Sequence, residues 1–430
     1  MTGTVFWMVL LLFGLVALNV PIAIALAIVA VGAMVLTQGP QVLPNVALVM
    51  YDGATSFSLL AIPLFIFAGA IMNATGISRR LIAFASALVG FIRGGLAMVS
   101  IVTSMFFAEM SGSAVADVAA LGTILAPAMK KTGYPRQFAA AVLSSAATIA
   151  VIIPPSIPMI LYAVMAESSV VKLFLAGVVP GVLVGLLMML LSYWFARRHN
   201  YPVAEAFSWR KLWATFKEAS WSFLLPVVIL GSIFGGLVTA TEGAGLAVVT
   251  ALLVGGLIYR ELRWKDLRKA MLEGAISTAV VMLLVASSAL LGTYLTELRV
   301  PQKLAQAIMG FTENRYVILA LLNVCFLVLG CFLHSAAAII LVVPIVMPLI
   351  HAAGIDPVHF GIIVTLNLGI GQQTPPVASV LITACSVAHA DIWEVTKVNV
   401  YFVGVIFLVL MLCTYVPAIP MGPVYLFYGG

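Results

Sequence analysis

Two proline pairs carry the residues whose types and spacing point to chemistry. In "IIPPS" (152–156) and "QTPPV" (373–377) a Pro-Pro pair interrupts an apolar run. Proline lacks a backbone N–H, so each pair frees carbonyls one turn earlier, and in hydrocarbon these carbonyls need another partner. Irregular backbone rich in oxygen suits a hard, singly charged cation such as Na⁺ better than a transition metal. The simpler alternative is a proline kink buffered by Ser and Thr.

Polar side chains gather at both breaks. The first break has hydroxyls at Ser144, Ser145, Thr148 and Ser156. The second break has amide and hydroxyl groups at Asn367, Gln372, Gln373 and Thr374. These side chains are candidate ligands for an ion or for a polar substrate.

A polar interruption precedes each break. In "AEMSGSAVAD" (108–117), Ser111, Gly112 and Ser113 are expected to form a tight turn whose amides meet an anion and whose carbonyls meet a cation. Glu109 and Asp117 are functional candidates unless they lie at an aqueous mouth. In "GCFLHSAAA" (330–338), His334 is a candidate proton relay, and a hydrogen-bonded structural histidine is the alternative.

The two polar regions repeat at one constant spacing along the chain. We call this spacing the repeat offset, and it equals the number of residues from Pro127 to Pro348. This shift superposes Pro127 on Pro348, Gly133 on Gly354, and the pair Pro154-Pro155 on Pro375-Pro376. Each half then has a hairpin, a connector ending in Gly, and a helix broken at Pro-Pro. Two such interruptions in corresponding places are typical of the binding site of a transporter with internal repeats.

Composition places these features in a membrane. The chain has 430 residues, of which 63% are hydrophobic and 8% are charged, and apolar runs of spanning length recur. Strand-like alternation is lacking, which disfavours an outer-membrane barrel. The fold class expected is therefore an all-α polytopic membrane protein. The N-terminal run has no basic flank and exceeds signal-peptide length, so it is expected to remain as membrane structure.

The pattern predicts a series of helices. Their expected ranges are 4–36 with an interruption at Asn19 and Pro21, 57–74, 78–92, 95–110, 118–130, 136–152, 157–166, 170–197, 221–240, 243–260, 274–297, 316–332, 336–350, 358–371, 377–389 and 392–415. Several are too short to span a bilayer, which indicates re-entrant hairpins and broken helices. Ten of the 21 Lys and Arg residues fall between Arg197 and Lys269, so these flanks are expected to face the cytoplasm, with a separate interfacial helix around "FSWRKLWATFKEASW".

Other chemistries lack a residue basis. The sequence has no H-E-x-x-H, no G-x-S-x-G and no P-loop, so hydrolysis and ATP use are not indicated, and the chain is not expected to be an enzyme. The four cysteines lie singly in apolar runs, as small hydrophobic residues do. The basic flanks do not indicate nucleic-acid binding. No cofactor is expected beyond Na⁺ as a coupling ion.

Long stretches resemble one family. "GGLAMVSIVTSMFFAEMSGSAVADVAALGTILAPAMKKTGY", "PPSIPMILYAV" and "GIDPVHFGIIVTLNLGIGQQTPPV" resemble the large membrane subunit of tripartite ATP-independent periplasmic (TRAP) transporters, and the likeness covers nearly the whole chain. The resemblance implies an inverted-repeat, elevator-type transporter of the bacterial inner membrane that imports an organic acid with Na⁺. It also implies two partners, a periplasmic solute-binding protein and a small four-helix membrane subunit. That subunit is expected to be separate, because the chain begins with large-subunit sequence.

The resemblance also implies domains and site residues. The expected division is 1–92 scaffold, 93–166 first transport repeat, 167–313 scaffold and arm helices, 314–390 second transport repeat, and 391–430 C-terminal scaffold helix. The residues expected to bind Na⁺ are Ser111, Gly112, Ser113, Thr148, Pro154, Pro155, Ser156, Ser335, Gly371, Thr374, Pro375 and Pro376. The residues expected to bind substrate are Ser113, Asp117, His334, Asn367, Gln372 and Gln373.

The chain departs from the family pattern at three places. Ala150 and Val151 stand where Gly-Pro is expected, and His334 stands where many members have an acidic residue. Gln372 and Gln373 replace two aliphatic residues, and their amides favour a hydroxylated substrate such as a sugar acid over a C4-dicarboxylate, unless they face the scaffold. A stand-alone Na⁺/dicarboxylate symporter or a cation/proton antiporter of related fold is the alternative function.

Overall fold

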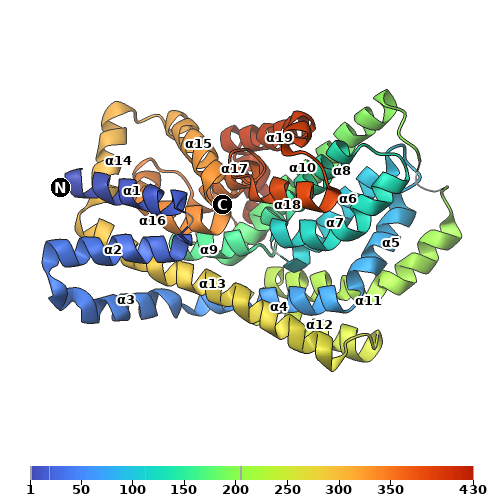
Figure 1. The fold of residues 1–430 in the computed structure, drawn as a ribbon, viewed down its shortest axis with the longest axis horizontal. Coiled ribbons are helices and arrows are strands. Elements are labelled where there is room, and N and C mark those ends of the chain that lie inside the picture. The colour runs from blue at the N-terminus through green and yellow to red at the C-terminus, as the bar shows by residue number, and fades with distance from the viewer. Residues whose placement is uncertain (1, 19, 112, 204–205, 430) are drawn as a thin grey trace.

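The chain folds into helices that pack side by side and end to end (Figure 1), as seen in a computed structural model. The structure describes residues 2–18, 20–111, 113–203 and 206–429, without the side chains of residues 2–3 and 108–111. The helices of the first half are α1 Thr2–Ala17, α2 Ile22–Gln38, η1 Pro40–Val42, α3 Leu43–Ala54, η2 Phe57–Leu60, α4 Ala61–Ala74, α5 Ile77–Val89, α6 Gly95–Ser111, α7 Ala114–Lys131, α8 Arg136–Thr148, η3 Ile149–Val151, α9 Ile157–Met165 and α10 Val170–Arg198.

The second half is also helical in its described part. Its elements are α11 Trp209–Phe234, α12 Ala240–Leu252, η4 Leu253–Ile258, α13 Trp264–Glu297, α14 Val300–Phe311, α15 Arg315–Phe332, α16 Ser335–Ala352, α17 Pro357–Gly371, α18 Ser379–Ala388, α19 Ile392–Tyr415 and α20 Ala418–Tyr428. Eight of the described helices are long and apolar enough to cross a membrane. The prediction of an all-α polytopic membrane protein is confirmed.

Most predicted helices are present, and three predictions were wrong or incomplete. The expected interfacial helix before residue 221 is not separate, because α11 runs without interruption from Trp209 to Phe234. Ser208 caps its start, and no residue before Pro226 disfavours a helix. The helix expected at 274–297 begins ten residues earlier at Trp264, because Lys, Arg and Glu are good helix formers that a hydropathy criterion rejects. Helices α3, α14 and α20 were not predicted.

The internal duplication is visible in the helix bounds. Helix α6 ends at Ser111 and α15 ends at Phe332, and these two ends are separated by the repeat offset. The same offset separates the starts of α7 and α16, and the starts of α8 and α17. Helices outside these motifs follow it within a few residues, since α2 corresponds to α12 and the start of α3 to the start of α13. The repeat therefore extends beyond the motifs from which it was predicted.

The two repeats interlock. The hairpin helix α7 packs against α18 of the second repeat, and α16 packs against α9 of the first. The broken helices meet at equivalent positions, because a Cβ added at Gly369 would lie 2.8 Å from Cγ2 of Thr148, its counterpart at the repeat offset. Each half-helix is thus held by the hairpin of the other repeat.

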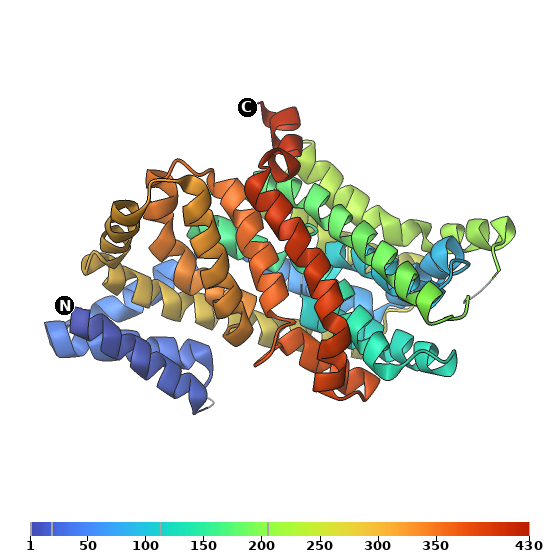
Figure 2. The ribbon, with the colours of Figure 1, turned by 90° about the horizontal axis from the view of Figure 1, so that it is seen from above.

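Other helices surround this interlocked pair. The long helix α13 runs diagonally past it in Figure 1 and packs against α2, α3 and α4. Helices α10 and α19, at corresponding places in the two halves, instead pack against α17 and α8 of the repeats. The short α20 projects at the top of Figure 2, next to the end of α19. The predicted division assigns residues 167–313 and 391–430, and with them α10 and α19, to the scaffold. These packing contacts do not test that assignment, which stays a prediction.

Charge distinguishes the two faces. Tyr134 donates a hydrogen bond to the Pro202 carbonyl, and Arg136 donates one to the His389 carbonyl, so the segments after α7, α10 and α18 lie at one face. Lys172, Arg299, Lys303 and Arg315 lie at helix ends on the opposite face, which leaves 17 of the 21 Lys and Arg residues at the first. By the positive-inside rule the first face is cytoplasmic.

An ion pair joins two distant segments of the chain at the cytoplasmic face. The Arg80 guanidinium of α5 donates to both carboxylate oxygens of Glu261, at 2.7 and 3.0 Å, and lies 3.8 Å from the centre of the Tyr259 ring. The hydrogen bond from Arg80 holds the pKa of the Glu261 carboxyl below its usual range. The bidentate geometry fixes α5 against the connection between α12 and α13.

Glycine at 371 permits the closest approach of the second break to its own hairpin. A Cβ added at Gly371 of α17 would collide with the backbone of Gly330 in α15. Gly371→Ala is therefore expected to force these helices apart and to destabilise the protein by about 1–3 kcal/mol. The measurement is the melting temperature of the purified protein in detergent.

Gly404→Ala is the matched control, because a Cβ at this position of α19 would meet no atom within 4 Å. Its melting temperature should equal or exceed that of the wild type. Equal melting temperatures for Gly371→Ala and Gly404→Ala would contradict the close packing described at the second break.

Candidate functional site

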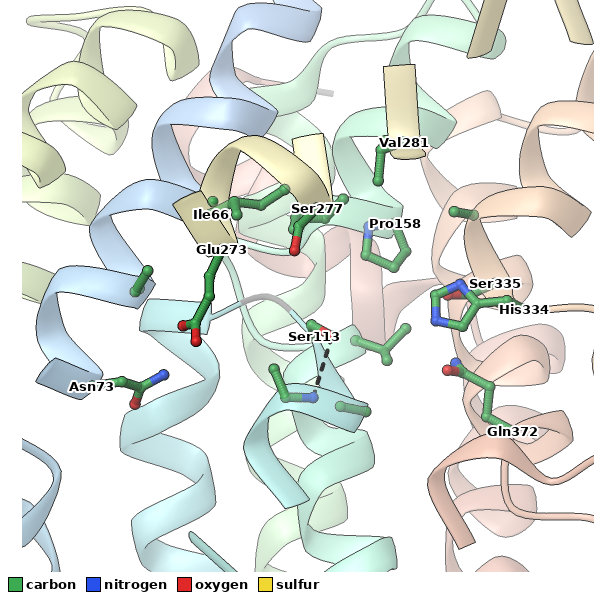
Figure 3. Close-up of a pocket in the computed structure, with 18 residues that line it drawn as sticks. Ile66, Asn73, Ser113, Pro158, Glu273, Ser277, Val281, His334, Ser335 and Gln372 are labelled. Atoms are coloured by element: carbon green, nitrogen blue, oxygen red, sulfur yellow. Dashed lines mark hydrogen bonds between the residues drawn. The ribbon is translucent and has the colours of Figure 1, made fainter. Parts of the chain in front are cut away.

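Both hairpin tips and both breaks line one cavity of about 280 Å³ (Figure 3). The first tip contributes Ser113 and Ala114, and the second contributes His334 and Ser335. The first break contributes Val151, Ile157 and Pro158, and the second contributes Gln372. The remaining wall comes from α4 and α13, with Asn73, Glu273 and Ser277 as its polar side chains. Residues far apart in the sequence thus meet in one place.

Three helices begin at this cavity. Helix α7 begins after Ser113, whose hydroxyl oxygen accepts a hydrogen bond from the Ala116 N–H at 3.5 Å, and α16 begins after His334. Helix α9 begins after Ser156, next to Ile157 and Pro158 of the cavity wall. The first N–H groups of a helix have no partner within the helix, and the helix dipole favours an anion at this end. The three starts together form a site suited to a negatively charged group.

Charged side chains are scarce around the cavity. Among the described residues that line it, neither Lys nor Arg occurs, and Glu273 is the one carboxylate. His334 is exposed to the cavity, and Ser335 beside it is buried. An anion in this cavity would therefore meet backbone N–H groups and hydroxyls rather than a Lys or Arg side chain.

Two hydroxyls of the first break bond to nearby carbonyls of their own segment. Ser156 donates to the Val151 carbonyl at 2.8 Å, and Thr148 donates to the Ser144 carbonyl at 3.1 Å. The peptide bond between Pro154 and Pro155 is cis, as is that between Pro375 and Pro376. Gly177 of α10 packs on the broken segment, since a Cβ there would lie 2.5 Å from the Ile152 oxygen. The hydroxyl oxygens keep lone pairs with which to accept from a donor or bind a cation.

A buried polar cluster supports the second break. Ser145 Oγ of α8 lies 2.8 Å from Gln373 Oε1 and 2.9 Å from Asn399 Oδ1 of α19. Asn399 Nδ2 donates to the backbone oxygen of Gln373 at 3.3 Å. Ser145, Gln373 and Asn399 are each at most 1% exposed. The cluster therefore ties the second break to the first repeat and to α19.

A second buried cluster lies along α17. Asn367 donates to Asn323 of α15 at 2.7 Å, and Asn323 donates to Thr414 of α19 at 3.2 Å. The Oδ1 atom of Asn367 is buried without a hydrogen-bond partner among the described residues. This cluster joins three helices of the second half.

The predicted site residues fall into three groups. Ser113, His334, Ser335 and Gln372 line the cavity. Gly112 lies outside the described residues, and the side chains of Ser111 and Glu109 are not described. The remaining residues do not line the cavity: Asp117, Thr148, Pro154, Pro155, Ser156, Asn367, Gly371, Gln373, Thr374, Pro375 and Pro376.

Sequence reasoning missed several polar residues near the site. Asn73, Glu273 and Ser277 line the cavity from α4 and α13, and Asn399 supports the second break from α19. Glu273 had a detectable signal, because Glu273-Gly274-Ala275 matches Asp52-Gly53-Ala54 at the repeat offset. Asn399 lies alone in an apolar helix, and no pattern connects it to Gln373.

Comparison with known proteins agrees with this geometry. A family model described as the tripartite ATP-independent periplasmic transporter, DctM component, matches residues 9–419. The chain belongs to this TRAP transporter family. As a member with eight candidate spans, it is a multi-pass protein of the bacterial inner membrane.

Several members of the TRAP family are similar over most of the chain. It is 40% identical over 415 residues to the isethionate TRAP transporter permease protein DctMQ of Oleidesulfovibrio alaskensis, covering 95% of this chain and 65% of that protein. It is 37% identical to the C4-dicarboxylate TRAP transporter large permease protein DctM of Vibrio cholerae, covering 95% of this chain and 94% of that one. It is 36% identical to the 2,3-diketo-L-gulonate TRAP transporter large permease protein YiaN of Escherichia coli, covering 94% and 95%.

A solved structure shares the fold. The crystal structure of the Alcanivorax borkumensis YdaH transporter matches with a TM-score of 0.63 at 15% identity, covering 91% of this chain and 90% of that one. At this identity the likeness shows the fold alone.

The cluster at the second break predicts non-additive mutational effects. Asn399→Leu is expected to leave the buried Ser145 hydroxyl and the Gln373 carbonyl short of partners, and to cost about 1–3 kcal/mol of stability. Adding Gln373→Leu removes a second polar side chain, so the double variant should lose less than the sum of the two single variants. Melting temperatures of the four proteins measure the coupling. If the stability losses of the two single variants add up to that of the double variant, the interaction of Gln373 and Asn399 in this cluster is contradicted.

Proposed function

We propose that the chain is the permease subunit that carries an organic acid inward together with Na⁺. The observation that carries the proposal is the cavity where two hairpin tips, two breaks and three helix N-termini meet without a Lys or Arg in the described wall. The helix starts favour a carboxylate or sulfonate. Cations bound at the breaks would supply the positive charge that the side chains lack.

The relatives support an acid as the substrate. Their names specify isethionate, C4-dicarboxylates, 2,3-diketo-L-gulonate and, in a Vibrio cholerae protein 35% identical to this chain, sialic acid. The substrates named are all organic anions and differ in size and hydroxylation. The shared property, a negative charge, matches the helix starts around the cavity of this chain.

The breaks are the proposed ion sites. Carbonyls and hydroxyls at Thr148, Pro154, Pro155 and Ser156 would bind one Na⁺ with the first tip, and those at Gly371, Thr374, Pro375 and Pro376 would bind another with Ser335. Carbonyl and hydroxyl oxygens are suitable ligands for this ion. Because the repeats interlock while α4 and α13 form the opposite wall, movement of both repeats past this wall would carry the site between the two faces, as an elevator does.

Two partners are part of the proposal. The family is described as tripartite, so the chain is proposed to work with a small membrane subunit and a periplasmic binding protein that delivers the acid. The cytoplasmic orientation of the Lys- and Arg-rich face leaves the opposite face for the binding protein.

Reconstitution tests transport and coupling together. Liposomes containing the chain with its small subunit should accumulate isethionate, succinate or sialic acid when an inward Na⁺ gradient and the matching binding protein are both present. Accumulation with choline in place of Na⁺ would contradict the coupling. Accumulation without a binding protein would instead favour a stand-alone symporter.

Gln372 provides a test of the substrate class. It lines the cavity, and its amide nitrogen makes a long hydrogen bond of 3.4 Å to Leu368 O, so the amide can reorient toward a ligand hydroxyl. We propose a hydroxylated acid as the substrate. Gln372→Leu is then expected to raise the KM for sialic acid about tenfold or more, and to leave the KM for succinate nearly unchanged.

Gln373→Leu is the matched control, because Gln373 faces Ser145 rather than the cavity. This variant should lower stability without changing the ratio of the two KM values. If Gln372→Leu leaves the ratio of the KM values for sialic acid and succinate unchanged, the proposed role of this amide in selecting the substrate is refuted.

A further inference from the structure

The scaffold wall of the cavity carries a carboxylate opposite the first hairpin tip. Glu273 of α13 points from this wall toward the region of Ser113, with Asn73 of α4 at its side (Figure 3). Its side chain is 60% exposed, so the carboxylate is free to move within the cavity. A negative charge thus faces a site that the three helix starts make suitable for an anion.

The ion pair that Glu273 makes is weak. Lys269, one turn earlier on α13, has its Nζ 3.7 Å from Glu273 Oε1, and the Lys269 side chain is 75% exposed. An exposed pair at this spacing contributes little and is screened by salt. Lys269 does not line the cavity, so Glu273 is the one carboxylate in its described wall and has neither Lys nor Arg beside it there.

A carboxylate in this position opposes a lone anion. Two like charges several ångströms apart repel in a partly solvated cavity, and a bound cation removes this repulsion. Glu273 would therefore lower the affinity for an organic acid more strongly when Na⁺ is absent than when Na⁺ is bound. This makes the residue a determinant of coupling rather than of substrate shape.

The repeat supplies a counterpart. Asp52-Gly53-Ala54 corresponds to Glu273-Gly274-Ala275, and each acid lies nine residues after the first residue of its helix, α3 or α13. The two helices begin at opposite faces, because Gln38, just before α3, donates a hydrogen bond to Glu297 at the far end of α13. Glu273 lies near the start of α13 at the cytoplasmic face. Asp52 lies at the same distance from the start of α3, which is at the opposite face.

We propose that Glu273 and Asp52 are paired scaffold carboxylates that exclude an unaccompanied anion from the site, Glu273 when the site opens toward the cytoplasm and Asp52 when it opens toward the opposite face. The inference rests on the proposed transport of an organic acid with Na⁺. In a transporter with inverted repeats, exchanging the conformations of the halves converts one orientation into the other, so equivalent residues take equivalent roles.

Equilibrium binding to the purified transporter, assembled with its small subunit, tests the role of Glu273. The probes are succinate, isethionate and sialic acid, each titrated in choline chloride and in NaCl of equal ionic strength. Glu273→Gln is expected to tighten the apparent Kd in choline by about three- to tenfold and to change it less than about twofold in saturating Na⁺. Asp52→Asn should shift the Kd in the same direction.

Two variants serve as controls. Glu273→Asp keeps the charge and should retain the Na⁺ dependence of the wild type. Glu313→Gln removes an exposed carboxylate far from the cavity and should change neither Kd. Melting temperatures confirm that each variant is folded.

The outcomes separate this inference from the proposed function. A wild type that binds none of the three acids more tightly in Na⁺ would contradict both. A wild type with Na⁺-dependent binding and a Glu273→Gln variant with the same Kd in choline would overturn the inference alone. An unchanged Asp52→Asn variant would overturn the pairing of the two residues.

Discussion

In a membrane-spanning chain, every backbone N–H and C=O in the hydrocarbon needs a partner, and a helix satisfies them by its own hydrogen bonds. The two Pro-Pro pairs break this arrangement in corresponding places. Most other features of the molecule follow from what replaces the lost bonds. Ser156 and Thr374 bond back to their own segments, and Asn399 donates to the backbone of the second break from another helix. Glycines 177, 330 and 371 let neighbouring helices come close enough to shield the breaks.

The same interruptions place charge-sensitive groups at the centre of the protein. A helix that stops and restarts presents a helix start within the membrane, and the hairpin tips present two more. The helix starts near Ser113, Ser156 and His334 meet around one cavity because the repeats interlock, each hairpin packing on the half-helix of the other. Helix α13 adds Glu273, and the described wall holds neither Lys nor Arg. The proposed dependence of anion binding on Na⁺ follows from this distribution of charge.

Much of this arrangement was predictable from the sequence, for identifiable reasons. The helices with apolar faces, the breaks at Pro-Pro and the internal repeat depend on local chemistry that single residues reveal. The start of α13 and the continuity of α11 were not predicted, because their polar residues form helices that hydropathy does not detect. The placement of Gln373 away from the cavity, against Ser145 and Asn399, depends on packing between helices far apart in sequence. Adjacent glutamines on one turn point in different directions, and only the three-dimensional fold determines which one reaches the cavity.

The central claim is that this cavity binds an organic anion through helix starts and accompanying cations. The most direct measurement is the melting temperature of the purified wild-type protein with an organic acid, in NaCl and in choline chloride of equal ionic strength. A ligand that binds the folded state raises the melting temperature by an amount that increases with the ratio of its concentration to its Kd. The account predicts that Na⁺ alone raises the melting temperature and that the acid raises it further only when Na⁺ is present. An equal rise with the acid in choline would contradict the claim.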